Sequence, residues 1–273
     1  MMNKKMINKK NYKNYSFWSR NPMTYVDFKK NIVERLPKTK KEFTRINKEL
    51  VRSNPDFLEI ISGLNKKIKN KIILDLGMGF GSSSIILSKY AKKVFSIDLT
   101  KIATTNAKRN IKINKIKNVS IRQMDAEQLS FNNDSFDFIF SWGVIHHSNN
   151  PEIILKKMKQ KLKKNGASFI MVYNFYSFRY IFLSLYHLFI KGHFFRGYNF
   201  TTIGKKFTDG YYNKHYRSSE MKKLLKKIGY KNIKISVGHH KGRIIPFVKS
   251  HDSYLARFLS RYYGYFLYAY FEK

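Results

Sequence analysis

The chain has 273 residues, of which 43% are hydrophobic and 16% are aromatic. This composition is too apolar for a disordered protein, and it is sufficient for the full core of one elaborated domain. The absence of cysteine excludes disulfide bonds and thiolate metal sites, and it fits a reducing compartment.

The net charge is strongly positive, because 54 lysines and arginines against 17 aspartates and glutamates give +37. Such a charge suits nucleic acid or an anionic membrane as a partner. The lysines are nonetheless spread over nearly every predicted helix, and the chain is rich in Asn and Ile, as an AT-rich genome would encode. We therefore interpret the charge mainly as a solvated surface of biased composition.

Residues 1–68 form a lysine-rich N-terminal segment that is predicted to be helical in its later part. Its first ten residues are positively charged, but no apolar stretch follows them, so no secretory signal is predicted and a cytoplasmic location is expected. Trp18, Pro22 and Tyr25 are expected in an irregular stretch. We expect this segment to pack as a cap across the ligand site of the main domain, residues 69–273.

The most informative stretch lies near the start of the main domain. Residues 72–74 are apolar, as in a parallel strand covered on both faces, and Asp75 follows them. Gly77, Gly79 and Gly81 then stand at alternate positions, where the absence of a Cβ lets the backbone turn sharply and approach a ligand. A run of three serines opens a helix. A strand, a glycine turn and a helix start together predict a cradle for a nucleotide or nucleoside.

The spacing of the glycines narrows the identity of the ligand. A dinucleotide fingerprint requires a glycine where Ser82 stands, and a P-loop requires a lysine after its last glycine, which this sequence lacks. No group that neutralises phosphate is therefore predicted. Asp75 would repel a pyrophosphate, whereas it can hold a cationic amino group. The predicted ligand is a nucleoside that carries positive charge.

Further strands follow, and polar residues stand at their ends. Residues 94–98 form a strand that ends in Asp98, whose carboxylate can accept hydrogen bonds from both hydroxyls of a ribose. Residues 119–124 form a third strand that ends just before Asp125, and residues 136–140 form a fourth. Asp98, Asp125 and Ser141 therefore stand at or directly after the ends of these three strands.

The pattern Asp-x-Gly-x-Gly-x-Gly, headed by Asp75, resembles motif I of the class I methyltransferases that use S-adenosylmethionine. A closer resemblance runs through residues 98–100, residues 125–127 and the segment Ser-Trp-Gly-Val-Ile-His-His-Ser at 141–148. These segments resemble the type 11 methyltransferases, which are relatives of the ubiquinone and menaquinone biosynthetic methyltransferases.

This resemblance covers residues 70–175, with weaker echoes at 17–22 and 209–229. It implies the fold, the cofactor S-adenosylmethionine and the reaction type, but not the methyl acceptor. Asp125 is implied to lie against the adenine amino group. The cofactor-binding residues that the resemblance and the spacing indicate are Asp75, Gly77, Gly79, Gly81, Asp98, Leu99, Asp125, Ala126, Ser141 and Trp142.

The rest of the chain continues to alternate helices and strands. Thr100 is predicted to cap the helix after the second strand, and a helix capped by Asn150 is predicted to end at Gly166. A later helix, capped by Ser218, closes at Gly229. Strands are predicted at residues 167–173, 232–237 and 265–271. The expected fold class is α/β, with a Rossmann-like, mostly parallel sheet of seven strands flanked by helices and with ligands at the strand carboxyl ends.

Residues 174–216 are predicted to be an insertion that forms a helical lid. Its portion 178–190 is apolar on almost every side, and such a helix must be buried by something. One interpretation is that it packs under the N-terminal cap or against a second subunit. The other is a lid for a hydrophobic acceptor, or an interfacial helix that dips toward lipid with Arg179, Lys191 and Arg196 beside it.

Methyl transfer from a sulfonium is an in-line displacement, so a site that orients the acceptor and excludes water supplies most of the rate. A base is required only if the acceptor carries a proton. His146 and His147 follow the fourth strand, and either can take such a proton. We prefer His147 as the catalytic base because it is farther from the strand; alternatively, one of the pair only supports the loop.

Trp142 is expected either to pack against the donor or to belong to the core. Further candidates for acceptor contacts are Tyr173, Asn174 and Arg179.

The expected acceptor is a small molecule or a lipid-like molecule. A nucleic-acid methyltransferase is less favoured, because such enzymes usually carry Asn/Asp-Pro-Pro-aromatic where residues 141–144 read Ser-Trp-Gly-Val. Two alternatives from other classes stay open. One is a basic nucleic-acid-binding protein that keeps the fold without catalysis, and the other is a peripheral membrane protein at the inner face of the membrane.

Two further predictions concern membranes and metals. The longest apolar runs, residues 180–190 and 262–271, are shorter than the roughly 18–20 residues that span a bilayer, so no membrane crossing is expected. His239, His240 and His251 have no acidic residue at ligand spacing, and no metal site is therefore predicted.

Overall fold

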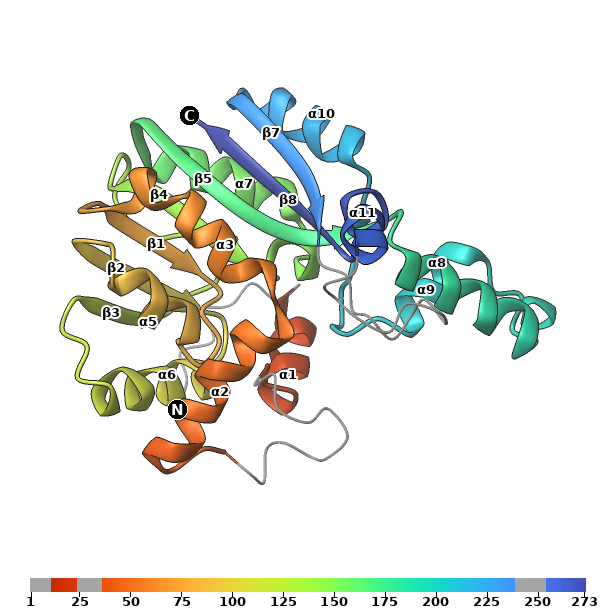
Figure 1. Ribbon diagram of the computed structural model, residues 1–273, viewed down its shortest axis with the longest axis horizontal. Helices are drawn as coiled ribbons and strands as arrows, with labels where there is room; N and C mark the ends of the chain where they lie inside the picture. The colour runs from red at the N-terminus through yellow and green to blue at the C-terminus, as the bar shows by residue number, and fades with distance from the viewer. Residues whose placement is uncertain (1–10, 24–35, 239–253) are drawn as a thin grey trace.

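The computed structural model describes residues 11–23, 36–238 and 254–273. Within them, a sheet of eight strands runs through the molecule (Figure 1). The strands are β1 (Ile72–Leu76), β2 (Lys93–Asp98), β3 (Val119–Gln123), β4 (Phe136–Trp142), β5 (Leu162–Asn174), β6 (His215–Tyr216), β7 (Lys231–Gly238) and β8 (Phe266–Glu272). The predictions for Tyr25, His239, His240 and His251 lie outside the described residues.

The strands follow the order β3-β2-β1-β4-β5-β8-β7, and the short β6 pairs with β5. The strands β3, β2, β1, β4 and β5 each run parallel to their neighbours in this order, and β6 is parallel to β5. In contrast, β8 is antiparallel to both β5 and β7. The carboxyl ends of β1, β2, β3, β4 and β5 therefore meet at one edge. This confirms the predicted Rossmann-like, mostly parallel sheet of seven strands, to which β6 adds a strand of two residues.

The helices flank the sheet, as predicted. They are α1 (Tyr12–Arg20), α2 (Lys40–Ser53), α3 (Asp56–Gly63), α4 (Asn65–Ile68), α5 (Ser82–Ser88), α6 (Lys101–Ile113), α7 (Pro151–Lys161), α8 (Phe178–Leu185), α9 (Phe200–Lys206), α10 (Ser218–Ile228) and α11 (Tyr254–Tyr263). Shorter helical turns are η4 (Ile145–His147), η5 (Tyr186–Ile190), which is a π-helix, and η6 (Phe194–Arg196).

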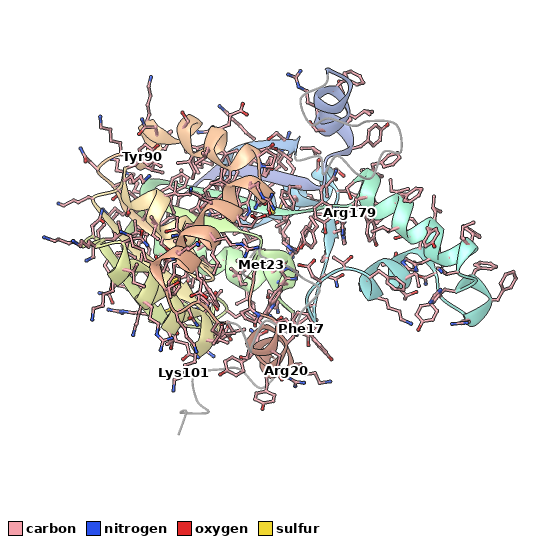
Figure 2. All side chains as sticks on the ribbon, turned by 60° about the horizontal axis from the view of Figure 1, so that its bottom comes forward. Phe17, Arg20, Met23, Tyr90, Lys101 and Arg179 are labelled. Carbon is pink, nitrogen blue, oxygen red and sulfur yellow. The ribbon has the colours of Figure 1, made fainter. Side chains whose placement is uncertain are left out.

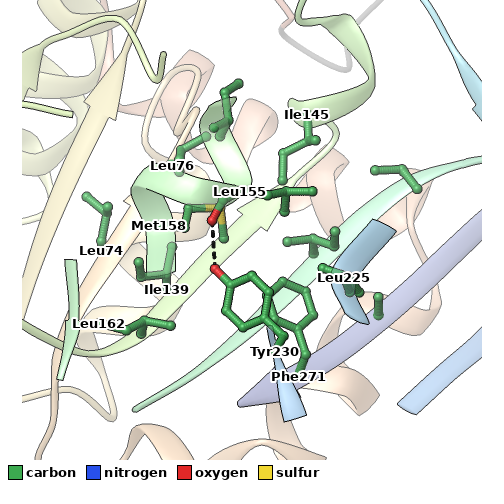
Figure 3. Packing of buried hydrophobic residues seen from close by; sticks show 14 of the residues in the cluster. Leu74, Leu76, Ile139, Ile145, Leu155, Met158, Leu162, Leu225, Tyr230 and Phe271 are labelled. Carbon is green, nitrogen blue, oxygen red and sulfur yellow. Dashed lines mark hydrogen bonds between the residues drawn. The ribbon is translucent and has the colours of Figure 1, made fainter. Parts of the chain in front are cut away.

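Two apolar clusters bury the two faces of the sheet. On one face, Leu155 of α7 and Leu225 of α10 belong to the same buried cluster as Leu74 of β1 (Figure 3). Tyr230 belongs to this cluster, and its hydroxyl donates to the carbonyl oxygen of Leu155 at 2.8 Å. On the other face, residues of α2 to α5 pack against Ile73, the neighbour of Leu74. Successive strand residues point to opposite faces, which explains why the apolar run of β1 serves both clusters.

The end of α7 differs from the prediction, because this helix stops at Lys161 and not at Gly166. Leu162 instead begins β5, where it is fully buried and pairs with Phe136 of β4. Asn165 has a φ of 64°, and the register between β4 and β5 shifts beside it. Leu162 fits both the apolar stripe of a helix and the core side of a strand, so its spacing alone misplaced the boundary.

The helix caps follow the prediction in part. Thr100 caps α6, because its hydroxyl accepts a backbone N–H of the first turn at 3.2 Å, and Gly229 ends α10 in the left-handed region. Asn150 occupies the cap position of α7 without a side-chain bond, and α10 begins at Ser218 with Arg217 in the cap position. The predicted cap position of Asn150, followed by Pro151 at the first helical position, is therefore confirmed, whereas the prediction of Ser218 as the cap of α10 was wrong by one residue.

Two segments extend beyond the sheet. Helices α1 and α2 of the N-terminal segment lie on the side to which β1 points, and α8 and α9 of the insertion project away from the body (Figure 1). Trp18 lies within α1 and not in an irregular stretch. The boundaries at 1–68, 69–273 and 174–216 stay predictions. In the described part of the chain, no helix has both the length and the hydropathy that crossing a bilayer requires.

Candidate active site

A cavity of about 480 Å³ lies at the carboxyl edge of the sheet. It is lined by the glycine loop after β1, by residues that follow β2, β3 and β4, by the N-terminal helices and by the insertion. The charged residues of its described lining are Asp98, Asp125, Asp209 and Arg179, and no lysine is among them. In a chain with a net charge of +37, this acidic lining suits a cationic ligand.

The glycine loop has the backbone shape that the sequence predicts. Gly77, Gly79 and Gly81 have φ values of 79°, 54° and 85°, which favour glycine. A Cβ on Gly77 would lie 2.1 Å from Cγ2 of Val144, whereas one on Gly79 would have no neighbour closer than 3.8 Å. Gly77 and Gly79 line the cavity. Gly81 does not line it, and its missing Cβ instead allows α5 to approach Ala107 of α6.

Asp98 lies at the end of β2 with its carboxylate held from two sides. One oxygen accepts hydrogen bonds from the backbone N–H and the hydroxyl of Thr100 at 2.9 and 3.0 Å. The other accepts from the N–H of Gly79 at 3.1 Å, which ties the strand end to the glycine loop. Burial raises the pKa of Asp98 above its usual value. Asp98 and Leu99 both line the cavity, where the sequence predicted a contact with ribose.

Asp75 lies behind the cavity and does not line it. One of its oxygens accepts hydrogen bonds from the hydroxyls of Ser83 and Ser84, both at 2.7 Å, and burial raises the pKa of Asp75 to about 6. The geometry therefore differs from the direct ligand contact that we expected, because Ser83 stands between Asp75 and the cavity. Ser141 is fully buried within β4 and also does not reach the cavity.

The predicted adenine contact, Asp125, is engaged by the N-terminal segment. The side-chain amide of Asn11 donates to both carboxylate oxygens, at 3.1 and 3.0 Å, and the N–H of Glu127 donates to one of them at 2.9 Å. Asp125 and Ala126 line the cavity together with Asn11. Asn11 therefore makes the kind of contact that the resemblance assigns to an adenine amino group, and it places the N-terminal segment against the predicted donor site.

The two adjacent histidines have different surroundings. His147 lines the cavity, and its Nδ1 lies 2.8 Å from the carbonyl oxygen of Tyr212. Because a carbonyl oxygen only accepts, Nδ1 carries the proton and Nε2 is left with a free electron pair. The ring of Trp18 packs edge-on against His147 at 4.9 Å. Burial lowers the pKa of His147, so the ring stays neutral below its usual range.

His146 is fully buried behind His147 and does not line the cavity. Its ring packs between His147 at 4.0 Å and Tyr173 at 3.9 Å. Neither ring nitrogen has a hydrogen-bond partner among the described residues, and burial lowers the pKa of His146 far below its usual value. The surroundings of His146 suit a supporting role, as one of the two interpretations of the pair expected.

The insertion and the last strand build the far side of the cavity. The hydroxyl of Tyr173 donates to the carboxylate of Asp209 at 2.8 Å, and the guanidinium of Arg179 lies over the ring of Tyr265 at 5.4 Å. Arg179 is placed where α8 leaves the body of the protein (Figure 2). The resemblance offered only a weak echo around Asp209, and no local pattern indicated Tyr265. These residues come from distant parts of the chain, so only folding brings them together.

Trp142 belongs to the core and also lines the cavity, so a contact with the donor stays a prediction. Its ring packs among core aromatics, at 4.7 Å from Phe57 and 5.8 Å from Tyr268. His215, which the sequence did not select, also lines the cavity and stacks on Tyr180 at 3.8 Å. Both rings therefore contribute to the aromatic part of the cavity lining.

His215 should make folding sensitive to acid. Burial lowers the pKa of its imidazole to about 3, whereas an unfolded histidine titrates near 6.5. Below pH 6.5 the unfolded state therefore binds the extra proton, and stability should fall as the pH decreases toward 3, by up to about 1.4 kcal/mol per pH unit. The variant His215→Phe, which keeps an aromatic ring, should reduce this slope in urea unfolding between pH 7 and 5. Equal slopes for the variant and the unmodified protein would contradict the prediction.

Several known proteins that are similar to this chain in sequence are methyltransferases. The family profile described as a methyltransferase domain, type 11, matches residues 74–170. The ubiquinone biosynthesis O-methyltransferase of Pelagibacter ubique is 32% identical over 114 residues, which are 42% of this chain and 47% of that protein. A probable cobalt-precorrin-6B C(15)-methyltransferase (decarboxylating) of Methanococcus maripaludis is 30% identical over 145 residues, 52% of this chain and 68% of that protein.

The fold resembles that of solved methyltransferases. The structure of phosphoethanolamine N-methyltransferase 2 from Haemonchus contortus, in complex with S-adenosyl-L-methionine, superposes with a TM-score of 0.58 at 15% identity. The superposition covers 89% of this chain and 59% of that one. At this level of identity the likeness concerns the fold alone.

The chain thus belongs to the class I S-adenosylmethionine-dependent methyltransferases. More particularly, its domain is a type 11 methyltransferase domain, and the methyl donor of that family is S-adenosyl-L-methionine. The chain spans less than half the length of the first curated relatives that it matches.

The residues of the donor half of the cavity fit this cofactor. Gly79 presents open backbone to the cavity, and Asp98 offers a carboxylate that is already oriented by its backbone partners. The cation of the lining, Arg179, lies on the insertion side. The described residues of the donor half include no lysine or arginine, which is compatible with a ligand that carries a sulfonium and an amino group, because neither meets a like charge among them.

Proposed function

We propose that this protein transfers a methyl group from S-adenosylmethionine to a small-molecule or lipid-like acceptor held between the sheet and the insertion. The observation that carries the proposal is the continuity of the cavity. Gly79, Asp98 and Asp125 line one end, and Tyr173 and Asp209 line the other. Two reactants bound in one partly enclosed space can be oriented for in-line displacement while water is excluded.

On the donor side, Asp98 and Leu99 hold the ribose, and Asp125 and Ala126 hold the adenine. Asp75 acts through Ser83 as a positioning residue, because it fixes the start of α5 beside the loop. The bound cofactor supplies an electrophilic methyl group on a sulfonium. The remaining task of the chain is to present an acceptor atom with a free electron pair.

His147 removes a proton from the acceptor where the acceptor carries one. Its neutral ring, with Nδ1 tied to the backbone of Tyr212, leaves Nε2 available as the base. The ring of His146 packs between His147 and Tyr173 and so supports the ring of His147. The hydrogen bond from Tyr173 to Asp209 in turn holds the ring of Tyr173 in place.

Nucleic acid is a weaker candidate for the acceptor. Although the net charge of the chain is +37, the described lining of the cavity contains one arginine, three aspartates and no lysine. A phosphate backbone that entered this space would meet more negative than positive charge. We retain the cytoplasm as the location, on the sequence pattern alone.

A transfer assay with labelled donor tests the proposed function. The protein is incubated with S-adenosylmethionine labelled in the methyl group and with pooled metabolite and lipid extracts, and label transfer is measured against a reaction with the Asp98→Ala variant. We expect label in a small-molecule or lipid fraction. If titration calorimetry detects no binding of S-adenosylmethionine to the unmodified protein, the proposal is overturned.

The role of His147 can be tested with the acceptor that the transfer assay identifies. His147→Gln should lower kcat by at least about tenfold while calorimetry still detects donor binding, because a general base contributes to the chemical step. Since burial lowers the pKa of His147 from 6.5, the acidic limb of the kcat/KM profile should lie below pH 6.5 and should disappear in the variant.

The matched control for this test is His193→Gln. The Nδ1 of His193 also meets a backbone carbonyl, that of His187 at 3.1 Å, but His193 does not line the cavity. This control variant should keep the turnover of the unmodified protein. Unchanged turnover in His147→Gln would remove His147 from the mechanism.

A further inference from the structure

The insertion carries a group of large apolar side chains that remain exposed. They lie on α8, η5 and η6, and we call them the apolar tip: Phe182, Leu185, Phe189, Ile190, Phe194 and Phe195. Ile190 is 73% exposed and Phe195 is 88% exposed. The rings of Phe189 and Phe194 stack at 5.9 Å, and those of Phe194 and Phe195 meet at 5.8 Å. Phe189, Phe194 and Phe195 are therefore in mutual contact within the tip, and monomeric proteins rarely expose a large apolar surface without a use for it.

The tip stands on the outer side of a helix whose inner side is part of the cavity wall. Tyr180, Leu183 and Ser184 of α8 line the cavity, whereas Phe182 and Leu185 on the same helix face solvent. Helices α8 and α9 project from the body of the molecule, which leaves the tip at its far end (Figure 1). A flat partner can therefore approach the tip without meeting the sheet.

Positive charge without acidic residues surrounds the tip. From residue 174 to residue 208 the sequence contains no Asp or Glu, and its cations are Arg179, Lys191, Arg196, Lys205 and Lys206. Among the described residues, no salt bridge engages Lys191, Arg196, Lys205 or Lys206. These cations are therefore available to an external anionic surface.

We propose that the apolar tip docks onto an anionic lipid bilayer, with its aromatic side chains in the boundary between head groups and acyl chains and its cations on lipid phosphates. Amphipathic helices with aromatic and basic residues bind membrane surfaces in this manner. A second copy of the chain would bring the same cations against themselves. RNA bases can stack on the aromatic rings of the tip, but RNA offers no acyl chains to cover the aliphatic side chains of Leu185 and Ile190. The docked orientation places the outer side of α8 on the bilayer while its inner side lines the cavity, so a lipid-like acceptor has only this helix to pass.

Vesicle co-sedimentation tests this docking with the full chain. Vesicles of phosphatidylcholine mixed with phosphatidylglycerol should retain the protein, and vesicles of phosphatidylcholine alone should retain much less. The double variant Ile190→Glu/Phe195→Glu should weaken retention by at least roughly tenfold, because two charges replace inserted apolar groups. The double variant Lys191→Gln/Arg196→Gln should weaken it by roughly fivefold per lost cation and should flatten its dependence on salt.

A matched control is Leu58→Glu on α3, which replaces an apolar side chain that is 48% exposed and lies outside the tip. It should keep vesicle binding, and all variants should keep donor binding by calorimetry, which separates loss of docking from loss of fold or of the proposed activity. The proposal is overturned if the unmodified protein stays in solution with anionic vesicles, or if the tip variants bind them as the unmodified protein does. It is also overturned if the tip variants convert a dimer to a monomer in sedimentation velocity while vesicle binding is unchanged.

Discussion

Replacing Asp98 with alanine should weaken the binding of S-adenosylmethionine by at least about 100-fold. A carboxylate that accepts two ribose hydroxyls makes two charge-assisted hydrogen bonds, each worth about 1.5–3 kcal/mol, so their loss amounts to about 3 kcal/mol or more. The substitution also frees the N–H of Gly79 and the hydroxyl of Thr100, which the carboxylate holds in place. Titration calorimetry with S-adenosylmethionine measures the effect directly.

The control for this experiment is Glu59→Ala, which removes an exposed carboxylate on α3 that does not line the cavity. It changes the net charge by the same amount, so it accounts for long-range electrostatics, and it should leave the affinity unchanged. Far-ultraviolet circular dichroism should show that both variants are folded. An affinity of Asp98→Ala equal to that of the unmodified protein would show that Asp98 does not hold the donor.

Replacing Gly77 with alanine should destabilise the protein by about 2–5 kcal/mol and disrupt donor binding. The φ of 79° at Gly77 costs an L-residue about 1–2 kcal/mol. The added Cβ would lie 2.1 Å from Cγ2 of Val144, and relief of that overlap costs roughly 1–3 kcal/mol. Urea unfolding gives the loss of stability, and calorimetry gives the loss of binding.

A second substitution separates the two causes. Gly77→Ala combined with Val144→Ala removes the atom that clashes but leaves the backbone strain. The double variant should therefore lose less unfolding free energy than the sum of the losses in the two single variants. Gly63→Ala is the matched control, because a Cβ there meets nothing within 4 Å. Full stability of Gly77→Ala would mean that the loop adopts another conformation and that the close approach to Val144 is dispensable.

The net charge of the chain and the charge of the described cavity lining have opposite signs. The chain carries a formal charge of +37, yet the described lining of the cavity contains three aspartates against one arginine. The described cations other than Arg179 therefore lie outside the cavity lining, where they can attract an anionic surface from a distance. We expect the acidic lining to favour a cationic donor, so the two parts of the surface need not compete for the same ligand.

The strands of the donor half could be predicted because each is specified by a local pattern. The apolar run of β1, the glycines after it and the acid at the end of β2 are all close in sequence to the backbone that they shape. The boundary of α7 was misplaced because Leu162 satisfies two periodicities at once, and only its pairing with Phe136 of β4 decides between them. Local patterns thus identified elements reliably where long-range pairing did not compete.

Within the site, the sequence by itself predicted which residues hold a methyl donor, because Gly77 and Gly79 directly follow β1 and Asp98 ends the next strand, β2. Only the tertiary structure decided that Ser83 stands in front of Asp75 and that Asn11 reaches Asp125 across 114 positions of the chain. The same holds for the hydrogen bond from Tyr173 to Asp209 and for the side of α8 that stays exposed. These features depend on packing between distant segments, and no local pattern of residues encodes which of the possible packings is realised.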